Sequence, residues 1–259
     1  MQPYGRNKFK TTLDIVRRID NWPAAVGMRL RQRKPGLQLL RFRDDLNVIC
    51  RGRSRDWDVI HELLFMNSYA RALQAIREAK APVTVIDLGG NIGLFSLLAA
   101  RQRPDVTIHA FEPGPPNYRI FEMNLLANPS LGERIHLHRE AVGGANSTVT
   151  WFFDEQNPGG SSLYGTSGQP FTVKIRSFED VLSSLPGPIG LVKIDIEGAE
   201  FGLLEETPAK AWSGISNIAL ELHDDPRRRM TREQFLERIK SLGFVGGGES
   251  VSTNFLSRK

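Results

Sequence analysis

One short stretch combines an acid with three glycines in a spacing that could hold a ligand. Val83–Gly93 reads VTVIDLGGNIG, an apolar, β-branched run followed by a glycine-rich turn. The pattern predicts a buried parallel strand, a tight turn and the start of a helix near Leu94. Glycines allow backbone geometry and a close approach that a Cβ would block, and the helix would point its N-terminal N–H groups at the loop. The stretch therefore predicts a ligand site at the carboxyl end of a strand.

Carboxylates end two consecutive predicted strands. Asp87 lies two residues before Gly89, and Glu112 ends the apolar run that begins at Val106. A carboxylate in the second position can accept hydrogen bonds from both vicinal hydroxyls of a ribose. The glycines do not follow the G-x-G-x-x-G register of dinucleotide-binding folds, which disfavours a nicotinamide cofactor. A plain strand–turn–helix connection is the alternative without chemistry.

Charged residues also end two later strands. They are Lys193, Asp195 and Glu197 after the run from Ile189, and Glu221 and His223 after the run from Ile215. The first three share a face if the strand persists, because strand side chains alternate. Charges at the end of a central strand are costly unless they are paired or functional. We expect adjacent strands to bring the two groups together, and a structural ion pair made by Lys193 is the alternative.

These motifs resemble a known enzyme family. D-x-G-x-N-x-G followed by F-E-P resembles the cofactor site of class I S-adenosylmethionine-dependent methyltransferases. K-I-D-I-E-G-A-E, followed by an E-x-H strand end, resembles the FkbM-type methyltransferases, which are mostly O-methyltransferases acting on sugars or polyketide-like natural products. The resemblance covers Arg51 to Lys259, and it is loose over Arg51–Tyr69. Gly90 stands where the family often has alanine, and we expect this departure to be harmless.

The resemblance implies S-adenosylmethionine as the cofactor and S-adenosylhomocysteine as the product. It places Asp87 and the glycines at the methionine part of the cofactor and Glu112 at the ribose. It also lets Glu140 accept a hydrogen bond from the adenine amino group. The expected cofactor-binding residues are Asp87, Gly89, Gly90, Asn91, Gly93, Glu112, Pro113, Glu140 and Ala141. Without the resemblance, Glu140 is simply an exposed glutamate at the end of a strand.

The expected mechanism is direct, in-line transfer of the methyl group with removal of a proton from an acceptor hydroxyl. His223 is the first candidate for general base, because its unperturbed pKa lies near neutrality. Asp195 is the second, either as the base or as the residue that orients His223. The expected catalytic residues are His223, Asp195, Glu197 and Lys193. The acids with His223 could ligate Mg²⁺, but Lys193 lowers the need for a cation, so we predict no metal.

The remaining pattern predicts the fold class. From residue 81, strands and helices alternate, which predicts an α/β, Rossmann-like class I methyltransferase sheet. We expect it to be mostly parallel, with an antiparallel edge strand and helices on both faces. We expect residues 1–80 to form a basic cap, with a helix over Thr11–Asp20, a hairpin around Asp44 and further helices. We expect residues 81–259 to form the cofactor domain. We expect the cap and the loop Asn157–Gln169 to face the substrate.

The charge of the chain is uneven. The net charge is +5, but residues 1–80 carry 17 Lys and Arg against 8 Asp and Glu. This excess of positive charge could bind an anionic polymer, a phospholipid surface or a phosphorylated substrate. The alternative is a basic surface that faces only solvent. A nucleic-acid methyltransferase is one alternative function, disfavoured because an N-P-P-Y motif and interleaved aromatic residues are missing. A non-catalytic scaffold that binds S-adenosylmethionine is another, because a fold does not establish catalysis.

The composition indicates the cellular compartment and the kind of partner we expect. The single cysteine, Cys50, excludes an internal disulfide and a cysteine-built metal site. One thiol fits a reducing, cytoplasmic location. We find no apolar run near the roughly 20 residues of a spanning helix and no secretory signal. The expected partner is a small-molecule or glycan acceptor, with peripheral membrane contact through the basic part as a further option.

Overall fold

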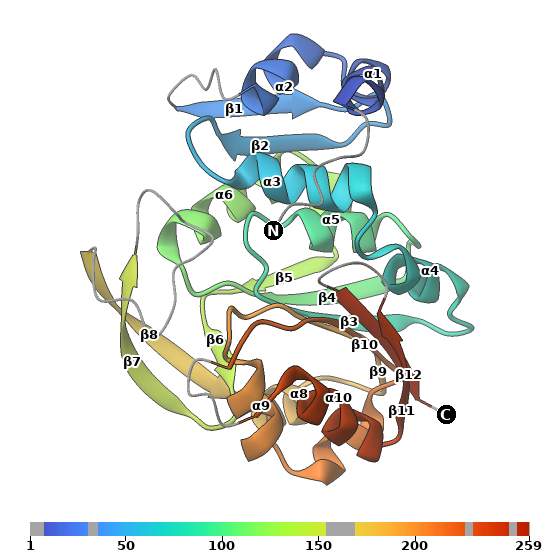
Figure 1. The fold of residues 1–259 in the computed structure, drawn as a ribbon, viewed down its shortest axis with the longest axis vertical. Helices are drawn as coiled ribbons and strands as arrows, with labels where there is room; N and C mark the ends of the chain where they lie inside the picture. Colours follow the sequence, from blue (N-terminus) through green and yellow to red (C-terminus); the bar gives the residue numbers. More distant parts are fainter. Residues whose placement is uncertain (1–7, 31–35, 154–168, 226–229, 249–252, 259) are drawn as a thin grey trace.

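A seven-stranded sheet forms the centre of the computed structural model, which describes residues 8–30, 36–153, 169–225, 230–248 and 253–258 (Figure 1). The strand order is β11-β12-β10-β9-β3-β4-β5. The strands are β3 (Val83–Leu88), β4 (Val106–Phe111), β5 (Ile135–His138), β9 (Ile189–Ile194), β10 (Asn217–Glu221), β11 (Phe244–Gly248) and β12 (Thr253–Arg258). Five are parallel, and β12 pairs antiparallel with β10 and β11. The predicted α/β class, with a mostly parallel sheet, is confirmed.

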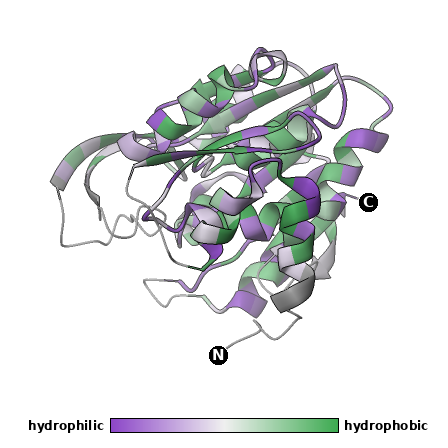
Figure 2. Ribbon diagram, turned by 90° about the horizontal axis from the view of Figure 1, so that it is seen from above, coloured by the Kyte–Doolittle hydropathy of each residue, from purple (hydrophilic) through white to green (hydrophobic). Residues whose placement is uncertain are grey.

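Helices cover both faces of this sheet, which is why its central strands are apolar on both sides. The helices α4 (Ala70–Glu78), α5 (Leu94–Ala100) and α6 (Pro115–Leu126) contribute to one hydrophobic core. The helices α8 (Phe178–Ser184), α9 (Glu200–Glu206) and α10 (Arg232–Ser241) contribute to the other. Hydrophobic and hydrophilic residues alternate along the covering helices (Figure 2). The sheet is thus held between two cores.

The N-terminal cap packs on the first of these cores. It contains α1 (Lys8–Arg18), α2 (Trp22–Arg29), β1 (Leu37–Arg41), β2 (Asn47–Arg51), α3 (Asp56–His61) and a π-helical turn (Glu62–Met66). Leu40 and Cys50 are fully buried in the same core cluster as Phe95 of α5. The predicted first helix and hairpin are confirmed. The sequence reading missed α2, whose Pro23 is tolerated because it lies in the first helical turn.

A second, three-stranded sheet stands beside the main one. Its order is β6-β8-β7, with β6 (Ala141–Gly143), β7 (Ser147–Phe153) and β8 (Gln169–Ser177), and it extends to the left in Figure 1. The remaining short helices are α7 (Pro129–Gly132) and a 3-10 turn (Ala209–Gly214). Of the predicted loop Asn157–Gln169, residues up to 168 lie outside the described residues. None of the described helices has the length and hydrophobicity that a membrane crossing requires.

Candidate active site

The glycine-rich loop after β3 is shaped by backbone geometry that few other residues adopt. Gly89 and Gly93 have φ of 80° and 86°, and Asn91 has φ of 49°. The N–H groups of Gly89 and Gly90 both donate to the carbonyl of Phe111, at 3.1 and 2.9 Å, which ties the loop to the end of β4. A Cβ on Gly89 would collide with the backbone oxygen of Asp195. Glycine is required there for both conformation and space.

Gly89 therefore gives a prediction with a matched control. Gly36 has a similar φ of 87°, but among the described residues no atom lies within 4 Å of a Cβ built on it. We expect Gly36→Ala to cost only the left-handed backbone penalty, about 1–2 kcal/mol. Gly89→Ala adds the collision and is expected to cost at least about 1–3 kcal/mol more. Urea unfolding of both variants measures the difference, and equal losses would contradict this account of the loop.

Gly90 is matched to an aromatic ring in this chain. A Cβ on Gly90 would lie 2.7 Å from Cε1 of Phe121, which is fully buried in α6. Its backbone is not in the left-handed region, so space alone restricts the position. An alanine, which we noted as common here in the family, would require Phe121 to shift. The glycine therefore makes room for a phenylalanine.

Glu112 lies directly under this loop. Its two carboxylate oxygens accept hydrogen bonds from the N–H groups of Asn91 and Gly114, both at 2.8 Å. The side chain is buried, and burial raises the pKa of Glu112 to about 7 although these bonds, Lys193 and Asn117 oppose the shift. A carboxylate offers roughly four acceptor positions. The observed partners therefore leave capacity for a further donor.

Asp87 lies deeper than a ligand contact would require. Its side chain is fully buried, accepts a hydrogen bond from the hydroxyl of Ser96 at 2.7 Å, and pairs with Lys193 at 3.2 Å. Its predicted contact with the methionine part of a cofactor stays a prediction. The observed partners show that Asp87 anchors a buried cation below the loop.

Lys193 connects three parts of the site. Its ammonium donates to the carbonyl of Gly89 at 2.7 Å and pairs with Asp87 and Asp195, each at 3.2 Å. Burial lowers the pKa of Lys193, but the two carboxylates outweigh this effect and raise it, so the side chain is charged. The predicted structural ion pair is thus present. It fixes the loop carbonyl and the Asp195 carboxylate relative to each other.

Lys193, Asp195 and Glu197 were expected to share a face if the strand persisted, and the strand does not persist that far. The strand β9 ends at Ile194, and Glu197 has a left-handed φ of 53° in the turn that follows. Side-chain alternation therefore stops before Glu197. The turn directs its carboxylate to His223 instead, at 3.7 Å.

Glu140 and Ala141 lie at the start of the second sheet. Glu140 precedes β6 and pairs with Lys174 of β8 at 3.0 Å, and Ala141 is the first residue of β6. Pro113 follows Glu112 and precedes α6. The predicted contact of Glu140 with the adenine amino group, and the cofactor-binding roles of Ala141 and Pro113, stay predictions.

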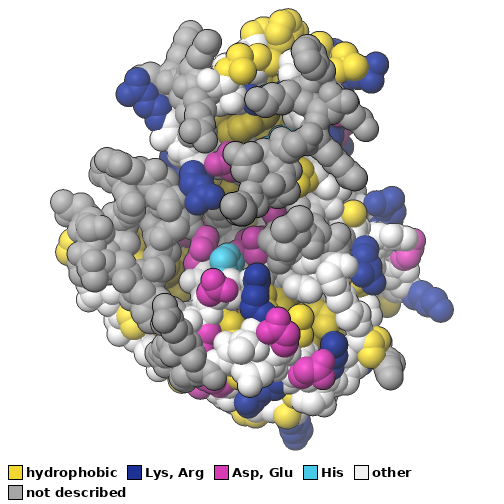
Figure 3. All heavy atoms as spheres, viewed as in Figure 1, with side chains coloured by type: hydrophobic (Ala, Val, Ile, Leu, Met, Phe, Trp, Pro, Cys, Tyr) yellow, Lys and Arg dark blue, Asp and Glu magenta, His cyan; other side chains and the backbone are white. Residues whose placement is uncertain are grey.

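A pocket opens over the loop between the sheet and the cap. Gly89, Gly90 and Asn91 form its floor. Its polar walls consist of Glu62 of the π-helical turn, Tyr69 before α4, Lys193 of β9, Asp195 after β9 and Glu221 of β10. Figure 3 shows acidic side chains gathered around a histidine in the middle of this face. The pocket therefore combines a glycine-rich floor with a wall that carries three carboxylates.

Glu221 is the pocket residue whose role the sequence reading missed. Burial, reinforced by the charges of Asp195 and Glu62, raises the pKa of Glu221 to about 7. The hydroxyl of the buried Tyr69 lies 3.4 Å from its Oε2 atom. The E-x-H strand end was the available signal, but it was used for the family resemblance and as a candidate metal ligand, not to assign a base. The structure makes Glu221 a carboxylate that can take up a proton near neutral pH.

His223 is bound differently from what a neutral base would need. Its Nδ1 lies 2.9 Å from the fully buried carboxylate of Glu200. Burial lowers the pKa of His223, but Glu200, Asp195 and Glu197 together raise it to about 9. The reason for choosing it, a pKa near neutrality, is therefore wrong. Nor does it belong to the described residues that line the pocket.

The raised pKa of His223 predicts a pH dependence of stability. A group with a raised folded-state pKa contributes stability fully below its unfolded pKa, near 6.5, and loses it as pH rises through about 9. We expect the free energy of unfolding to fall by about 1–3 kcal/mol over this range. The difference between wild type and His223→Gln in urea unfolding at each pH measures this contribution. Parallel pH curves for the two proteins would contradict it.

The absence of a metal from this site stays a prediction. No group of three or more His, Cys, Asp or Glu side chains that could hold a metal ion occurs in the part of the chain that the structure describes. The acids instead have Lys193 and His223 as their cations.

Comparison with known proteins identifies the family. The model of the methyltransferase FkbM domain matches residues 87–245, which include both groups of strand-end residues. The chain belongs to the FkbM methyltransferase family. "Methyltransferase 1" of Beauveria bassiana (strain ARSEF 2860) is 30% identical over 183 residues, covering 62% of this chain and 72% of that protein. The FkbM family is thus matched over the cofactor domain, and the chain is an S-adenosylmethionine-dependent methyltransferase.

Two further FkbM proteins are similar to this chain. The "31-O-demethyl-FK506 methyltransferase FkbM" of Streptomyces tacrolimicus is 25% identical over 169 residues, which cover 54% of this chain and 65% of that protein. The crystal structure of methyltransferase FkbM from Methylobacillus flagellatus KT is 17% identical with a TM-score of 0.48. The comparison covers 95% of this chain and 60% of that one. The chain thus spans less than two thirds of both proteins.

The residues of this FkbM site fit the cofactor that the family implies. The glycines let the loop pack closely on the backbone of Asp195 and the ring of Phe121, where a Cβ at Gly89, Gly90 or Gly93 would collide. Glu112 ends the next strand with acceptor capacity left. The acidic wall suits a cation such as a sulfonium. Nothing in the described site opposes S-adenosylmethionine.

Proposed function

We propose that this chain is an O-methyltransferase that transfers a methyl group from S-adenosylmethionine to a hydroxyl of a natural product or sugar. The observation that carries the proposal is Glu221, a half-buried carboxylate that lines the pocket and has a pKa of about 7. Deprotonation of a hydroxyl requires a positioned base whose pKa lies near the working pH. Glu221 meets this condition better than His223, which is held as a cation.

Each residue of the site has a distinct task in this proposal. The loop and Glu112 would hold the cofactor, which supplies a methyl group on an activated sulfonium. Lys193 keeps the loop carbonyl of Gly89 and the carboxylate of Asp195 in place. Glu221 takes the proton from the acceptor oxygen. Asp87 supports this arrangement from below through Lys193.

His223 and Glu197 act outside the pocket in this scheme. His223 joins the turn after β9 to the end of β10 through Glu200 and Glu197. Because Asp195 begins that turn and Glu221 ends β10, the histidine sets the distance between two pocket carboxylates. We therefore assign His223 a positioning task and keep Asp195 as the second candidate for the base.

The hydroxyl acceptor is supported by a relative. The Streptomyces tacrolimicus protein is named for methylating 31-O-demethyl-FK506, and such a name describes transfer to an oxygen. We extend this acceptor class to the present chain as part of the proposal. The cytoplasmic location belongs to the same proposal and is supported by the single, buried thiol of Cys50. A nucleic-acid acceptor is disfavoured because the pocket wall is acidic.

Two measurements test the proposal. Calorimetric titration with S-adenosylhomocysteine, with NAD as the comparison, is expected to show one saturable site for the former only. Transfer of labelled methyl groups is then measured with hydroxyl-bearing polyketides and sugars and with their amino analogues. Binding of NAD instead would overturn the cofactor assignment. Binding of S-adenosylhomocysteine with transfer only to amines or to RNA would overturn O-methylation.

A further inference from the structure

A stripe of asparagines on α6 faces the N-terminal cap. Asn117, Asn124 and Asn128 are spaced by seven and four residues, so they lie on one side of the helix and just beyond its end. All three are buried. Buried amides are retained only where hydrogen bonds compensate their desolvation. Their partners therefore show what the stripe holds.

The stripe completes the open edge of β2. Asn124 accepts from the N–H of Ile49 at 2.6 Å and donates to its carbonyl at 3.0 Å. Asn128 does the same for Asn47, at 2.9 and 2.7 Å. Each side-chain amide thus imitates the backbone of a neighbouring strand, because it offers one donor and one acceptor to a residue that a strand would pair. The cap is docked by helix side chains.

Asn124 also reaches the cofactor loop. Its side-chain amide donates to the carbonyl of Ile92 at 2.8 Å, inside the turn that carries Asn91 and Gly93. Asn128 makes a second bond too, but to the backbone carbonyl of Asn124, within the helix. The two residues therefore dock the same strand in the same way. Only Asn124 connects that strand to the loop.

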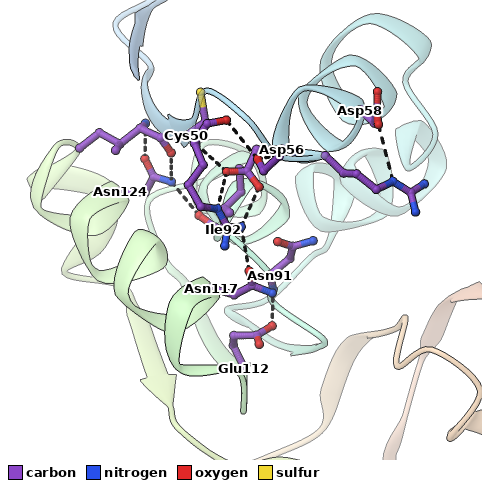
Figure 4. A network of polar contacts seen from close by, with 12 residues as sticks. Cys50, Asp56, Asp58, Asn91, Ile92, Glu112, Asn117 and Asn124 are labelled. Carbon is purple, nitrogen blue, oxygen red and sulfur yellow. Dashed lines mark hydrogen bonds and ion pairs between the residues drawn. The ribbon is translucent and has the colours of Figure 1, made fainter. Parts of the chain in front are cut away.

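A second path joins the same two parts. The guanidinium of Arg51, at the end of β2, donates to Asn117 at 2.8 Å and pairs with Asp56 at 2.7 Å. Asn117 hydrogen-bonds Glu112, which in turn accepts from the N–H of Asn91. Figure 4 shows these links converging on the loop from the cap. The cap thus contacts both the carbonyl side and the N–H side of the loop.

We propose that Asn124 is a positioning residue that couples the N-terminal cap to cofactor binding by holding the loop carbonyl of Ile92 against β2. The inference rests on the proposed function, in which Asn91 and Glu112 hold the cofactor. Because the loop conformation is set partly by the cap, a displaced cap weakens cofactor binding. Linkage requires the converse, that cofactor binding makes the cap open less often.

The stripe itself supplies the matched variants. Asn124→Ala and Asn128→Ala each remove one accepted and one donated hydrogen bond to β2. We therefore expect the two variants to lower stability by similar amounts. Only Asn124→Ala is expected to weaken S-adenosylhomocysteine binding, about tenfold, as a lost hydrogen bond to a buried carbonyl would do. Asn124→Asp keeps the acceptor for Ile49 and loses the donor for Ile92, so it is expected to bind weakly as well.

Calorimetry and hydrogen exchange separate the outcomes. Dissociation constants are measured where urea unfolding shows each variant to be folded, and exchange of the Ile49 amide is followed with and without ligand. We expect the ligand to slow this exchange in wild type and less so in Asn124→Ala. Equal affinities of the Asn124 and Asn128 variants would overturn the coupling. A wild type that binds no S-adenosylhomocysteine would overturn the proposed function itself.

Discussion

Replacing Glu221 with glutamine is expected to lower kcat about 10²–10⁴-fold, the usual contribution of a general base. Glutamine has nearly the same shape and can still accept a hydrogen bond from Tyr69, whose hydroxyl lies 3.4 Å from the carboxylate. Affinity for S-adenosylhomocysteine should therefore stay within a few-fold of wild type. Steady-state kinetics with an accepted hydroxyl substrate, together with calorimetry, measures both effects.

The pH profile distinguishes Glu221 from its neighbours. A base must be deprotonated, so wild-type kcat is expected to rise with pH through about 7, the pKa of Glu221. His223→Gln should keep this rise, because His223 is already charged in that range and lies outside the pocket. A profile that instead rises only near pH 9 and disappears in His223→Gln would return the base role to the histidine.

The second large effect is expected for Lys193→Met. This change removes the cation between Asp87 and Asp195 and leaves the carboxylate of Asp87, which is fully buried, without its ion-pair partner. Breaking a buried pair on one side typically costs about 3–5 kcal/mol. The variant should also lose cofactor affinity, because the carbonyl of Gly89 loses its donor. Urea unfolding measures the loss of stability.

A double variant makes this prediction specific. In Asp87→Asn combined with Lys193→Met, no uncompensated buried charge remains at Asp87, and Ser96 can still bond residue 87. We expect about half or more of the lost stability to return. The coupling energy from the full cycle isolates the pair. Additive losses in the double variant would show that Asp87 and Lys193 stabilise the fold independently.

Local patterns predicted most of the fold. Buried parallel strands read as apolar runs, so Val83–Leu88 and Val106–Phe111 were predicted at their observed bounds. Capping also has a local signal: Ser177 caps α8 by accepting from the N–H of Asp180, and Thr231 forms a capping box with Gln234 at the start of α10. The helices that were not predicted include α9, and also α2, whose tryptophan and proline do not resemble a typical helix. The stability of α2 comes from packing of Ala25 and Met28 in the cap core.

The sequence predicted which residues form the site better than it predicted their roles. Strand-end positions follow from strand patterns, so Lys193, Asp195 and Glu221 were all found. Their protonation depends on burial and on partners far away in sequence, which no local pattern contains. Tyr69 lies 152 residues from Glu221, and Glu200 lies 23 residues from His223. The exchange of roles between Glu221 and His223 therefore needed the structure.

The asparagine stripe had no readable signal for a related reason. Asparagine on a helix usually marks an exposed or terminal position. Here the asparagines hydrogen-bond a strand that lies more than 70 residues earlier in the chain. Only the tertiary arrangement turns these side chains into backbone substitutes.

Cys50 gives this cap a natural reporter. The thiol lies on β2 next to Arg51, is fully buried, and lies 3.7 Å from the sulfur of Met28. Burial raises the pKa of Cys50 to about 12, so its thiolate is almost absent at neutral pH. Alkylating reagents react with thiolates, and they can reach this one only when the packing around Cys50 in the cap opens. Because the chain has one cysteine, the rate of its modification counts cap-opening events without any engineered label.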